Sequence, residues 1–515
     1  MFRHLPVYAC APETLIALGQ TMIHREEREN GMLDKPVEVA DKEDENRSTL
    51  GDTDDGPLRL PAGYTYFGQF VDHDITFDRA SSLTRQNDPD ALTNFRTARF
   101  DLDSLYGGGP GHQPYLYEKD GVRLRLSADR HDLQRNDGER ALIGDPRNDE
   151  NLIISQLQVA FVKFHNAVAE LIGQNSHRDD LFNAAQRTVR RHYQWIVIHD
   201  FLPRIIGDAV IKKNAVIDDI LRSEDYRSRG RGGEPIARPT TRPLLLFYHS
   251  KVQPAFMPVE FSVAAYRFGH SMVRPSYLIN DYTRANRQTK DRHRIPLFSE
   301  TEDPDDLCGL NGFRRLPPTG VVEWKYFLDG IEETDPALPQ PSYMIDTQLS
   351  DSLGRLPASG AVVQELLPEL KPDIAQTAAR SLATRNLLRG RALDLPSGQD
   401  VARAMGIDPL TNEELFEDVE FDGDLLKVLE VTAGDVRKDL RDRAPLWFYI
   451  LREAALEAGG AHLGPVGGRI VAEVLIGLLA GDPLSYLSVN PTWKPTLPSR
   501  TPGTFTLSDL INFGL

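Results

Sequence analysis

The sequence predicts a mainly α-helical fold in a single domain with few short strands. Three observations predict it: apolar residues recur at helical spacing over several long stretches, alternating strand-like segments are few and short, and no internal repeat of fixed period occurs. A chain of 515 residues with 40% hydrophobic and 26% charged residues has the composition of a globular protein and can bury a sizeable core.

Helical periodicity is clearest in the stretch from Leu152 to Leu171 and resumes from Ala184 to Phe201, so two long helices are expected there. Further helical signals cover Phe261 to Val273, Asp373 to Leu388, Gly398 to Ala404, Ala444 to Ala458 and Gly467 to Leu479. These stretches together predict a helical core.

Two polar stretches interrupt this pattern. Residues 26–57 are acidic and nearly free of large apolar side chains, which favours an exposed arm or linker. We therefore expect an N-terminal acidic extension over residues 1–57 and one packed domain over residues 58–515, beginning near Leu58. Residues 227–243 carry glycine and proline among five arginines without any period, so a surface loop is expected there.

Charge and cysteine content bear on partners and location. A net charge of -17 repels nucleic acid and anionic lipid, and no basic stripe with interleaved aromatic residues reverses this locally. The apolar stretches Leu15 to Leu18 and Val474 to Ala480 fall well short of the roughly 20 residues that a membrane helix needs. We recognise no signal peptide, and only two cysteines occur, so a cytoplasmic location is the default expectation and non-classical secretion the alternative.

The most concentrated polar motif runs from Gly68 to Asp74. Two carboxylates, Asp72 and Asp74, bracket the imidazole of His73 among aromatic residues. Imidazole is the side chain best suited to exchange a proton near neutral pH. Taken alone, the motif is equally compatible with a helix end or a buried structural histidine.

A second motif offers oxygen atoms at alternate positions. Thr97, Asp101 and Asp103 supply side-chain oxygens, and Arg99 supplies its main-chain carbonyl. Calcium binds six to eight oxygens of these kinds, and residues two apart on an extended segment can turn them toward one point. The alternative is a solvated turn rich in aspartate, serine and glycine.

The third motif runs from Gly144 to Asn151, and its Arg147 stands just before the first long helix. Asn148 or Asp149 is expected to cap that helix, which leaves Arg147 without a structural role. A fourth motif, from Glu260 to Ser271, contains one histidine, His270, on an otherwise apolar helical stretch. A lone histidine in such a setting is more often part of the core than a ligand.

Together and in this order, the four motifs resemble the animal-type haem peroxidases of the peroxidase-cyclooxygenase superfamily. The resemblance runs from about Tyr64 to Trp493 and includes Asn386 to Arg391, Leu395 to Gln399 and Gly481 to Pro483. It implies that residues 58–515 form a catalytic domain with haem b and calcium. The implied activity reduces hydrogen peroxide and, through a ferryl form of the iron, oxidises a halide, a pseudohalide or a small organic donor.

The resemblance also implies roles on the distal side of the haem. His73 matches the distal histidine, which would move a proton on the peroxide. Arg147 matches the distal arginine, which would stabilise charge on the departing oxygen, and Gln69 matches an amide near the halide position. Asp72 and Glu150 match the two carboxylates that form ester bonds to haem methyl groups.

On the proximal side, the resemblance makes His270 the iron ligand and places Arg267 among the haem-binding residues. Gln399 stands where the family usually has an asparagine that hydrogen-bonds the proximal imidazole. This departure leaves the contact open, with the longer amide of Gln399 as the candidate partner. Asn151 replaces a methionine that forms a third haem link in the myeloid enzyme. The implied calcium ligands are Asp74, Thr97, Arg99 through its carbonyl, Asp101 and Asp103.

Three other functions compete with a peroxidase. A fatty-acid dioxygenase would use a tyrosine radical, but Tyr266 lies four residues before His270 rather than three, which on an α-helix turns it by about 100°. A haem-free adhesion or matrix protein would have been expected to lose at least one of the residues above. A zinc hydrolase is weaker still, because no second histidine stands at ligand spacing from His73.

Overall fold

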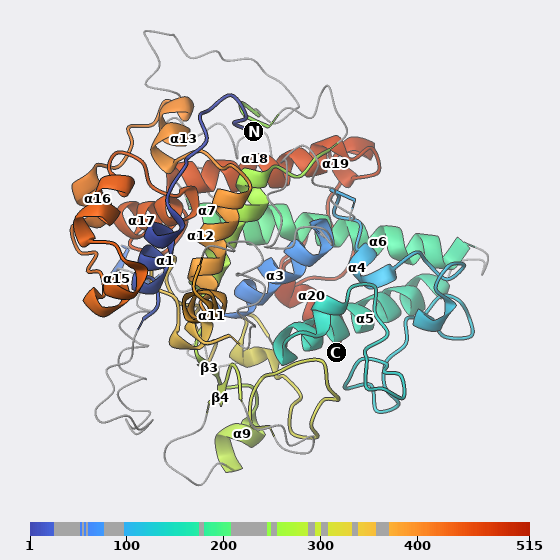
Figure 1. The fold of residues 1–515 in the computed structure, drawn as a ribbon. Coiled ribbons are helices and arrows are strands. Elements are labelled where there is room, and N and C mark those ends of the chain that lie inside the picture. The colour runs from blue at the N-terminus through green and yellow to red at the C-terminus, as the bar shows by residue number, and fades with distance from the viewer. Residues whose placement is uncertain are drawn as a thin grey trace.

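The computed structural model describes residues 1–24, 52–53, 56–57, 60–76, 97–174, 180–207, 245–248, 255–286, 294–299, 307–331, 338–356 and 370–514. Within these residues the chain is mainly helical, as predicted, and its helices share one apolar core (Figure 1). The α-helices are α1 (Pro12–Thr21), α3 (Gly63–Ile75), α4 (Asp103–Tyr106), α5 (Leu152–Gly173), α6 (Leu181–Ile196), α7 (Leu202–Ile206), α9 (Asp281–Asn286), α11 (Pro372–Arg380), α12 (Leu382–Ala392), α13 (Gly398–Met405), α14 (Asn412–Phe416), α15 (Gly423–Leu429), α16 (Ala433–Leu440), α17 (Leu446–Ala458), α18 (Pro465–Gly481), α19 (Tyr486–Val489) and α20 (Leu507–Gly514).

Short irregular helices and strands complete these elements. The 3-10 helices are η2 (Pro114–Leu116), η3 (Pro146–Asp149), η8 (Ala265–His270), η9 (Trp324–Tyr326) and η10 (Asp351–Gly354), and the π-helices are η5 (Val197–Phe201) and η7 (Glu260–Ala264). Strand β1 (Asp52–Thr53) pairs antiparallel with β2 (Gly56–Pro57), and β3 (Ser276–Tyr277) pairs antiparallel with β4 (Ile295–Pro296). The described strands are therefore few and short, as expected.

Helix α5 confirms the first predicted long helix. Its N-cap is Asn151, whose side-chain oxygen accepts a hydrogen bond from the backbone N–H of Ile153, so the expectation of a cap at Asn148 or Asp149 is wrong. By length and composition α5 could cross a membrane, but 83% of its most apolar stretch is buried inside the protein. Helices α3, α6 and α20 pack against it.

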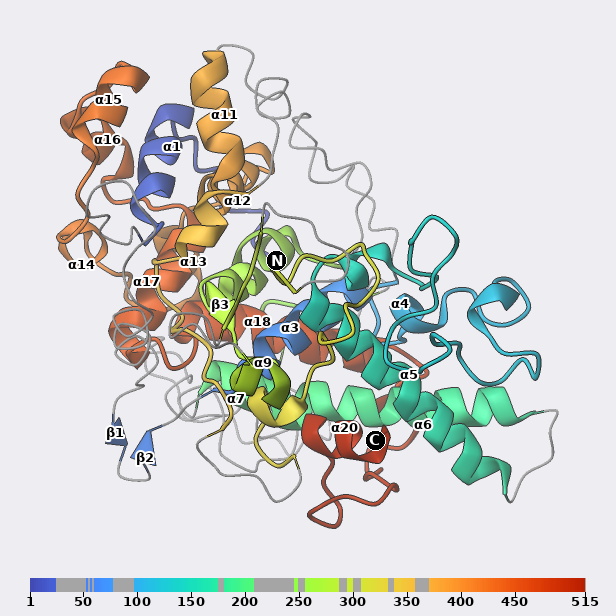
Figure 2. The same ribbon diagram turned by 90° about the horizontal axis from the view of Figure 1, so that it is seen from below.

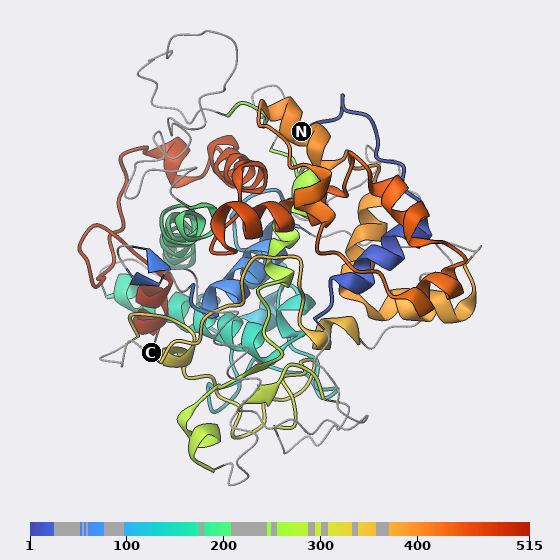
Figure 3. The same cartoon turned by 90° about the vertical axis from the view of Figure 1, so that its left-hand side faces the viewer.

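The first 24 residues belong to the packed body. Helix α1 buries Leu15, Ile16 and Leu18 and packs on α12 and α16, and Figures 2 and 3 show it in blue among the orange helices of the C-terminal part. A Cβ added at Gly19 would lie only 2.7 Å from the Cα atom of Thr384, which shows how closely α1 approaches α12.

The expectation that packing begins near Leu58 is therefore wrong for residues 1–24, because the C-terminal helices cover the apolar side of α1. Residues 25–51 lie outside the described residues, so the acidic arm and the division of the chain into two parts stay predictions. The loop predicted over residues 227–243 also lies outside the described residues.

Two of the predicted helices differ in detail from the expectation. The stretch from Phe261 to Val273 contains a π-helix, η7, followed by a 3-10 helix, η8, rather than one α-helix. The stretch from Asp373 to Leu388 is interrupted at Ser381, whose side chain caps α12 by accepting from the backbone N–H of Thr384. The predicted helices at α6, α13, α17 and α18 are confirmed.

Candidate active site

Helix α3 carries the histidine of the first motif. Its apolar side packs on α5, where the rings of Phe70 and Phe161 stack with centroids 4.3 Å apart. A Cβ added at Gly63 would lie 2.7 Å from the carbonyl oxygen of Phe327, so the glycine allows this close approach. These contacts fix α3 so that His73, near its C-terminal end, is only 4% exposed.

Both ring nitrogens of His73 face polar side chains from the segment before α5. Its Nδ1 lies 2.7 Å from Oδ1 of Asn148, which in turn donates from Nδ2 to Oε1 of Gln158 at 2.9 Å. Its Nε2 lies 3.6 Å from Oε1 of Glu150. Gln69 donates to that same Glu150 oxygen at 2.5 Å. The structure thus brings together three of the predicted site residues, Gln69, His73 and Glu150.

Arg147 joins the end of α3 to the segment before α5. Its guanidinium donates to the carbonyl oxygen of His73 at 3.0 Å and to that of Thr76, and it pairs with Asp145 at 2.8 Å. Its Nη1 lies 4.0 Å from Oδ2 of Asp72. Arg147 therefore holds the backbone around His73, and its role toward peroxide stays a prediction.

The predicted calcium ligands also converge. Carboxylate oxygens of Asp74, Asp101 and Asp103 lie within 4.8 Å of one another, and Thr97 donates from Oγ1 to Oδ2 of Asp101 at 2.6 Å. Carboxylate and hydroxyl oxygens in such a cluster are the ligand types that calcium prefers. The coordinating role of the Arg99 carbonyl stays a prediction.

His270 stands at the end of η8 and is held by helices from the C-terminal part of the chain. Its Nδ1 lies 2.8 Å from Nδ2 of Asn386 on α12. Arg267 donates from Nη1 to Oδ1 of Asn386 at 2.8 Å, and Trp447 on α17 donates from its indole to the carbonyl oxygen of Arg267 at 3.2 Å. These contacts orient the imidazole from the side of Nδ1.

The prediction that Gln399 hydrogen-bonds His270 is wrong. Its Oε1 accepts from the backbone N–H of Ala444 at 2.7 Å, and its Nε2 is buried with no partner among the described residues. The amide of Gln399, on α13, therefore contacts the backbone just before α17 instead. Asn386 occupies the position that was expected for Gln399.

Burial and positive charge set the protonation of the proximal residues. Burial, together with the charges of Arg267 and Arg385, lowers the pKa of His270 to about 3. Burial and the neighbouring Arg389 lower the pKa of Arg267 to about 10, while Asp72 acts in the opposite direction. The imidazole is therefore neutral, which is the form that binds a metal.

Several features beside His270 bear on whether a haem could bind there. A Cβ added at Gly269 would have no atom within 4 Å, so open space adjoins the proximal histidine. The hydroxyl of Tyr266 is buried and has no hydrogen-bond partner among the described residues. Burial raises the pKa of this hydroxyl, and the negative charge of Asp72 raises it further. Half-buried arginines, a neutral imidazole and adjoining open space fit the chemistry of a cofactor that carries carboxylates and an iron to be ligated.

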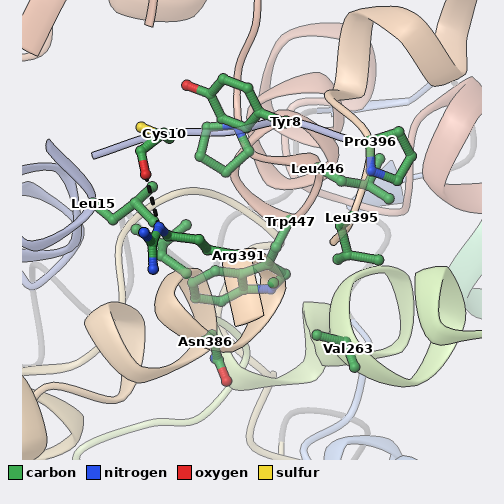
Figure 4. Close-up of a pocket in the computed structure, with 13 residues that line it drawn as sticks. Tyr8, Cys10, Leu15, Val263, Asn386, Arg391, Leu395, Pro396, Leu446 and Trp447 are labelled. Carbon is green, nitrogen blue, oxygen red and sulfur yellow. Dashed lines mark hydrogen bonds between the residues drawn. The ribbon is translucent and has the colours of Figure 1, made fainter. Parts of the chain in front are cut away.

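A small pocket lies next to the proximal residues. Figure 4 shows Asn386 and Val263 at one end of it, Tyr8 and Cys10 of the N-terminal segment at the other, and Trp447 between them. Residues of the N-terminal segment therefore line this pocket beside the proximal residues. We had expected that segment to lie outside the packed domain.

Comparison with protein families decides the relationship of the chain. A family model described as animal haem peroxidase matches residues 40–316, which is more than half of the chain. The chain belongs to the animal haem peroxidase family. This confirms the resemblance drawn from the four motifs.

Individual relatives are distant. The chorion peroxidase of Drosophila melanogaster is 26% identical over 346 residues, which cover 67% of this chain and 34% of that protein. The thyroid peroxidase of Mus musculus is 22% identical over 444 residues, which cover 81% of this chain and 41% of that protein. The chain thus spans about a third of the length of the chorion peroxidase.

Solved structures agree with the fold. Peroxidase A from Dictyostelium discoideum superposes with a TM-score of 0.53 at 16% identity, covering 98% of this chain and 90% of that one. A fatty acid alpha-dioxygenase of Arabidopsis thaliana superposes with a TM-score of 0.54 at 14% identity, covering 99% of this chain and 74% of that one. At these identities the superpositions establish the mainly α-helical fold of the superfamily.

Sequence reasoning missed two residues that touch the histidines. Asn386 is the first residue of the segment Asn386 to Arg391, which carried part of the family resemblance. That position was the sequence signal that could have identified it as the residue that contacts His270. Asn148 follows Arg147 directly, but it was interpreted as a helix cap because it stands just before an apolar helix. Only the packing of α3 against this segment distinguishes the two interpretations.

Proposed function

We propose that the protein is a haem peroxidase that reduces hydrogen peroxide and oxidises a small anionic or aromatic donor. The observation that carries this function is the pair of histidines, His73 and His270, each with an asparagine side chain at Nδ1. A partner at Nδ1 fixes the orientation of each ring. One Nε2 would exchange a proton and the other would bind iron.

Four side chains would hold the cofactor. When bound, the haem supplies an iron centre that accepts the oxidising equivalents of the peroxide. His270 would ligate that iron, and the guanidinium of Arg267 would supply positive charge to balance the haem carboxylates. Asp72 and Glu150, whose side chains are 35% and 38% exposed, are proposed to form the ester bonds to the haem.

His73 would act on the peroxide by moving one proton. Nε2 accepts the proton of one peroxide oxygen and returns it to the other, which leaves as water. Positioned acid-base catalysis of this kind contributes about 10²- to 10⁴-fold. Arg147, which is always cationic, would stabilise negative charge on the leaving oxygen, and Gln69 would offer its amide to an anionic donor.

We also propose that calcium occupies the cluster of Asp74, Asp101 and Asp103 with Thr97 and the carbonyl of Arg99. Asp74 follows the distal histidine directly, so the ion would hold the end of α3 in place. Exhaustive chelation should therefore lower the thermal midpoint and the rate with peroxide together. Full stability and full activity in verified calcium-free protein would contradict this calcium site.

Spectroscopy and steady-state kinetics test the proposed function. Purified protein should show a Soret absorption band and should consume hydrogen peroxide with at least one donor from a panel of chloride, bromide, iodide, thiocyanate and phenols. Extraction with acidified acetone should leave the haem attached if the ester bonds form. A protein without a Soret band would instead favour a haem-free adhesion or matrix role.

A fatty-acid dioxygenase is the second candidate, and the buried, unpartnered hydroxyl of Tyr266 favours it. Its ring stacks on Phe261 with centroids 4.6 Å apart. The helix here is of the 3-10 type, so a position four residues before His270 is turned by about 120° from the position three before. Oxygen uptake with linoleate in the absence of added peroxide, abolished by Tyr266→Phe, would establish this activity in place of the peroxidase.

A further inference from the structure

A chain of two buried amides stands behind the distal histidine. Asn148 and Gln158 are 0% and 1% exposed. Oδ1 of Asn148 lies 2.7 Å from Nδ1 of His73, and Nδ2 of Asn148 donates to Oε1 of Gln158 at 2.9 Å. The amides therefore connect α5, which carries Gln158, to the imidazole on α3.

This connection determines which nitrogen of the ring carries the proton. Because Gln158 accepts from the amide nitrogen of Asn148, the amide oxygen of Asn148 faces the ring. An amide oxygen can only accept a hydrogen bond, so Nδ1 of His73 must donate. In a neutral imidazole the lone pair is then on Nε2. That is the nitrogen that lies on the side of Glu150 and Gln69.

The segment that carries Asn148 is itself held rigidly. Phe313 donates from its backbone N–H to the carbonyl oxygen of Asp149 at 2.6 Å, and Gly312 donates to that of Glu150 at 3.2 Å. The carboxylate of Asp149 pairs with Arg135 at 2.7 Å. These contacts fix η3 without using the side chain of Asn148.

A helix-capping role does not account for Asn148. The cap of α5 is Asn151, which accepts from the backbone N–H of Ile153. The polar atoms of the Asn148 side chain instead contact His73 and Gln158. A buried amide with both ends used in this way has an orienting role toward the ring.

We propose that Asn148, oriented by Gln158, is a positioning residue that keeps Nδ1 of His73 protonated and Nε2 available as the base for peroxide; this rests on the peroxidase function proposed above. Asn148 touches neither peroxide nor haem in this role. Its loss should let the ring rotate or adopt the other tautomer, so the step that needs a base slows while steps that need none do not.

The test compares Asn148→Ala and Gln158→Leu with the control Asn151→Ala. The control removes an asparagine from the same segment, so it loses the cap of α5 and leaves both partners of the His73 ring in place. Stopped-flow measurements would give the rate constants for hydrogen peroxide and for the reducing donor separately. Asn148→Ala should lower the peroxide rate constant by about 10- to 100-fold, as for other partners that orient an imidazole. Gln158→Leu should lower it less, and the donor rate constant should not change.

Ligand binding supplies a readout besides activity. Hydrogen cyanide must give up its proton to bind ferric haem as cyanide, whereas carbon monoxide binds ferrous haem without proton transfer. Asn148→Ala and Gln158→Leu should therefore slow cyanide binding while leaving carbon monoxide binding and the Soret band unchanged. The control should bind both ligands as the unmodified protein does.

Equal peroxide rate constants and equal cyanide binding in Asn148→Ala, Gln158→Leu and the control would overturn the positioning role. So would equal losses for cyanide and carbon monoxide, because these would indicate general damage to the pocket. If Asn148→Ala does not fold, Gln158→Leu decides by the same two measurements. The peroxidase function fails separately if the unmodified protein binds no haem or does not react with peroxide.

Discussion

The distal and proximal histidines differ in the charge of the groups behind them. Each imidazole has an asparagine at Nδ1, 2.7 Å away at His73 and 2.8 Å away at His270. Behind the first asparagine lies the neutral amide of Gln158, and behind the second lies the guanidinium of Arg267. The two contacts also differ in polarity, because an amide oxygen faces Nδ1 of His73 and an amide nitrogen faces Nδ1 of His270.

This difference suits two different tasks. Positive charge and burial lower the pKa of His270 to about 3, so the ring stays neutral and available to a metal across the ordinary pH range. Neutral amides behind the distal ring fix its orientation without adding charge. A metal ligand must not take up a proton, whereas a proton-transfer group must exchange one.

The largest expected effect belongs to the proximal side. His270→Ala removes the proposed iron ligand, so the purified protein should lose its Soret band and peroxide turnover should fall below detection. Absorption spectra and steady-state assays measure both. A variant that retained a full Soret band and full turnover would place the iron ligand elsewhere in the chain.

The next largest effect is expected on the distal side. His73→Ala should retain haem and lower the rate constant for peroxide by about 10²- to 10⁴-fold, because only the proton-transfer group is lost. His112→Ala, which changes an exposed histidine, serves as the control. Unchanged turnover in His73→Ala would remove the distinction between the two histidines.

Replacing the proximal asparagine tests which amide supports the iron ligand. Asn386→Leu should lower haem affinity or turnover by about 10- to 100-fold, as loss of an outer partner does at other metal-bound histidines. Gln399→Leu should leave haem affinity near that of the unmodified protein, because this amide contacts the backbone of Ala444. Haem titration of both variants measures the difference. The opposite ranking would restore Gln399 as the partner of His270.

The smallest effect on catalysis is expected where α1 packs behind the proximal side. Gly19→Ala would force a Cβ to within 2.7 Å of the Cα atom of Thr384, so stability should fall by about 1–3 kcal/mol. Gly423→Ala has no atom within 4 Å of the new Cβ and should be neutral or slightly stabilising. Denaturant unfolding of the two variants compares them. Equal stabilities would show that the contact between α1 and α12 is looser than the structure indicates.

Much of the fold could be predicted because helical periodicity is local. The pattern from Leu152 to Leu171 requires only that residues three and four apart share a face, and α5 follows it. Helix α1 was missed because its ten residues form a weak pattern next to an acidic stretch. Its burial depends on α12 and α16, which lie more than 350 residues away in the sequence.

By itself, the sequence determined which residues could carry the chemistry: His73, Arg147 and His270 stand in motifs whose order identifies the family. Tertiary structure alone decided the partners of those residues. Whether Asn148 caps a helix or faces the imidazole, and whether Asn386 or Gln399 reaches His270, depends on how separate helices pack. Local patterns cannot settle such contacts, because side chains 75 and 116 residues apart meet only once the core has formed.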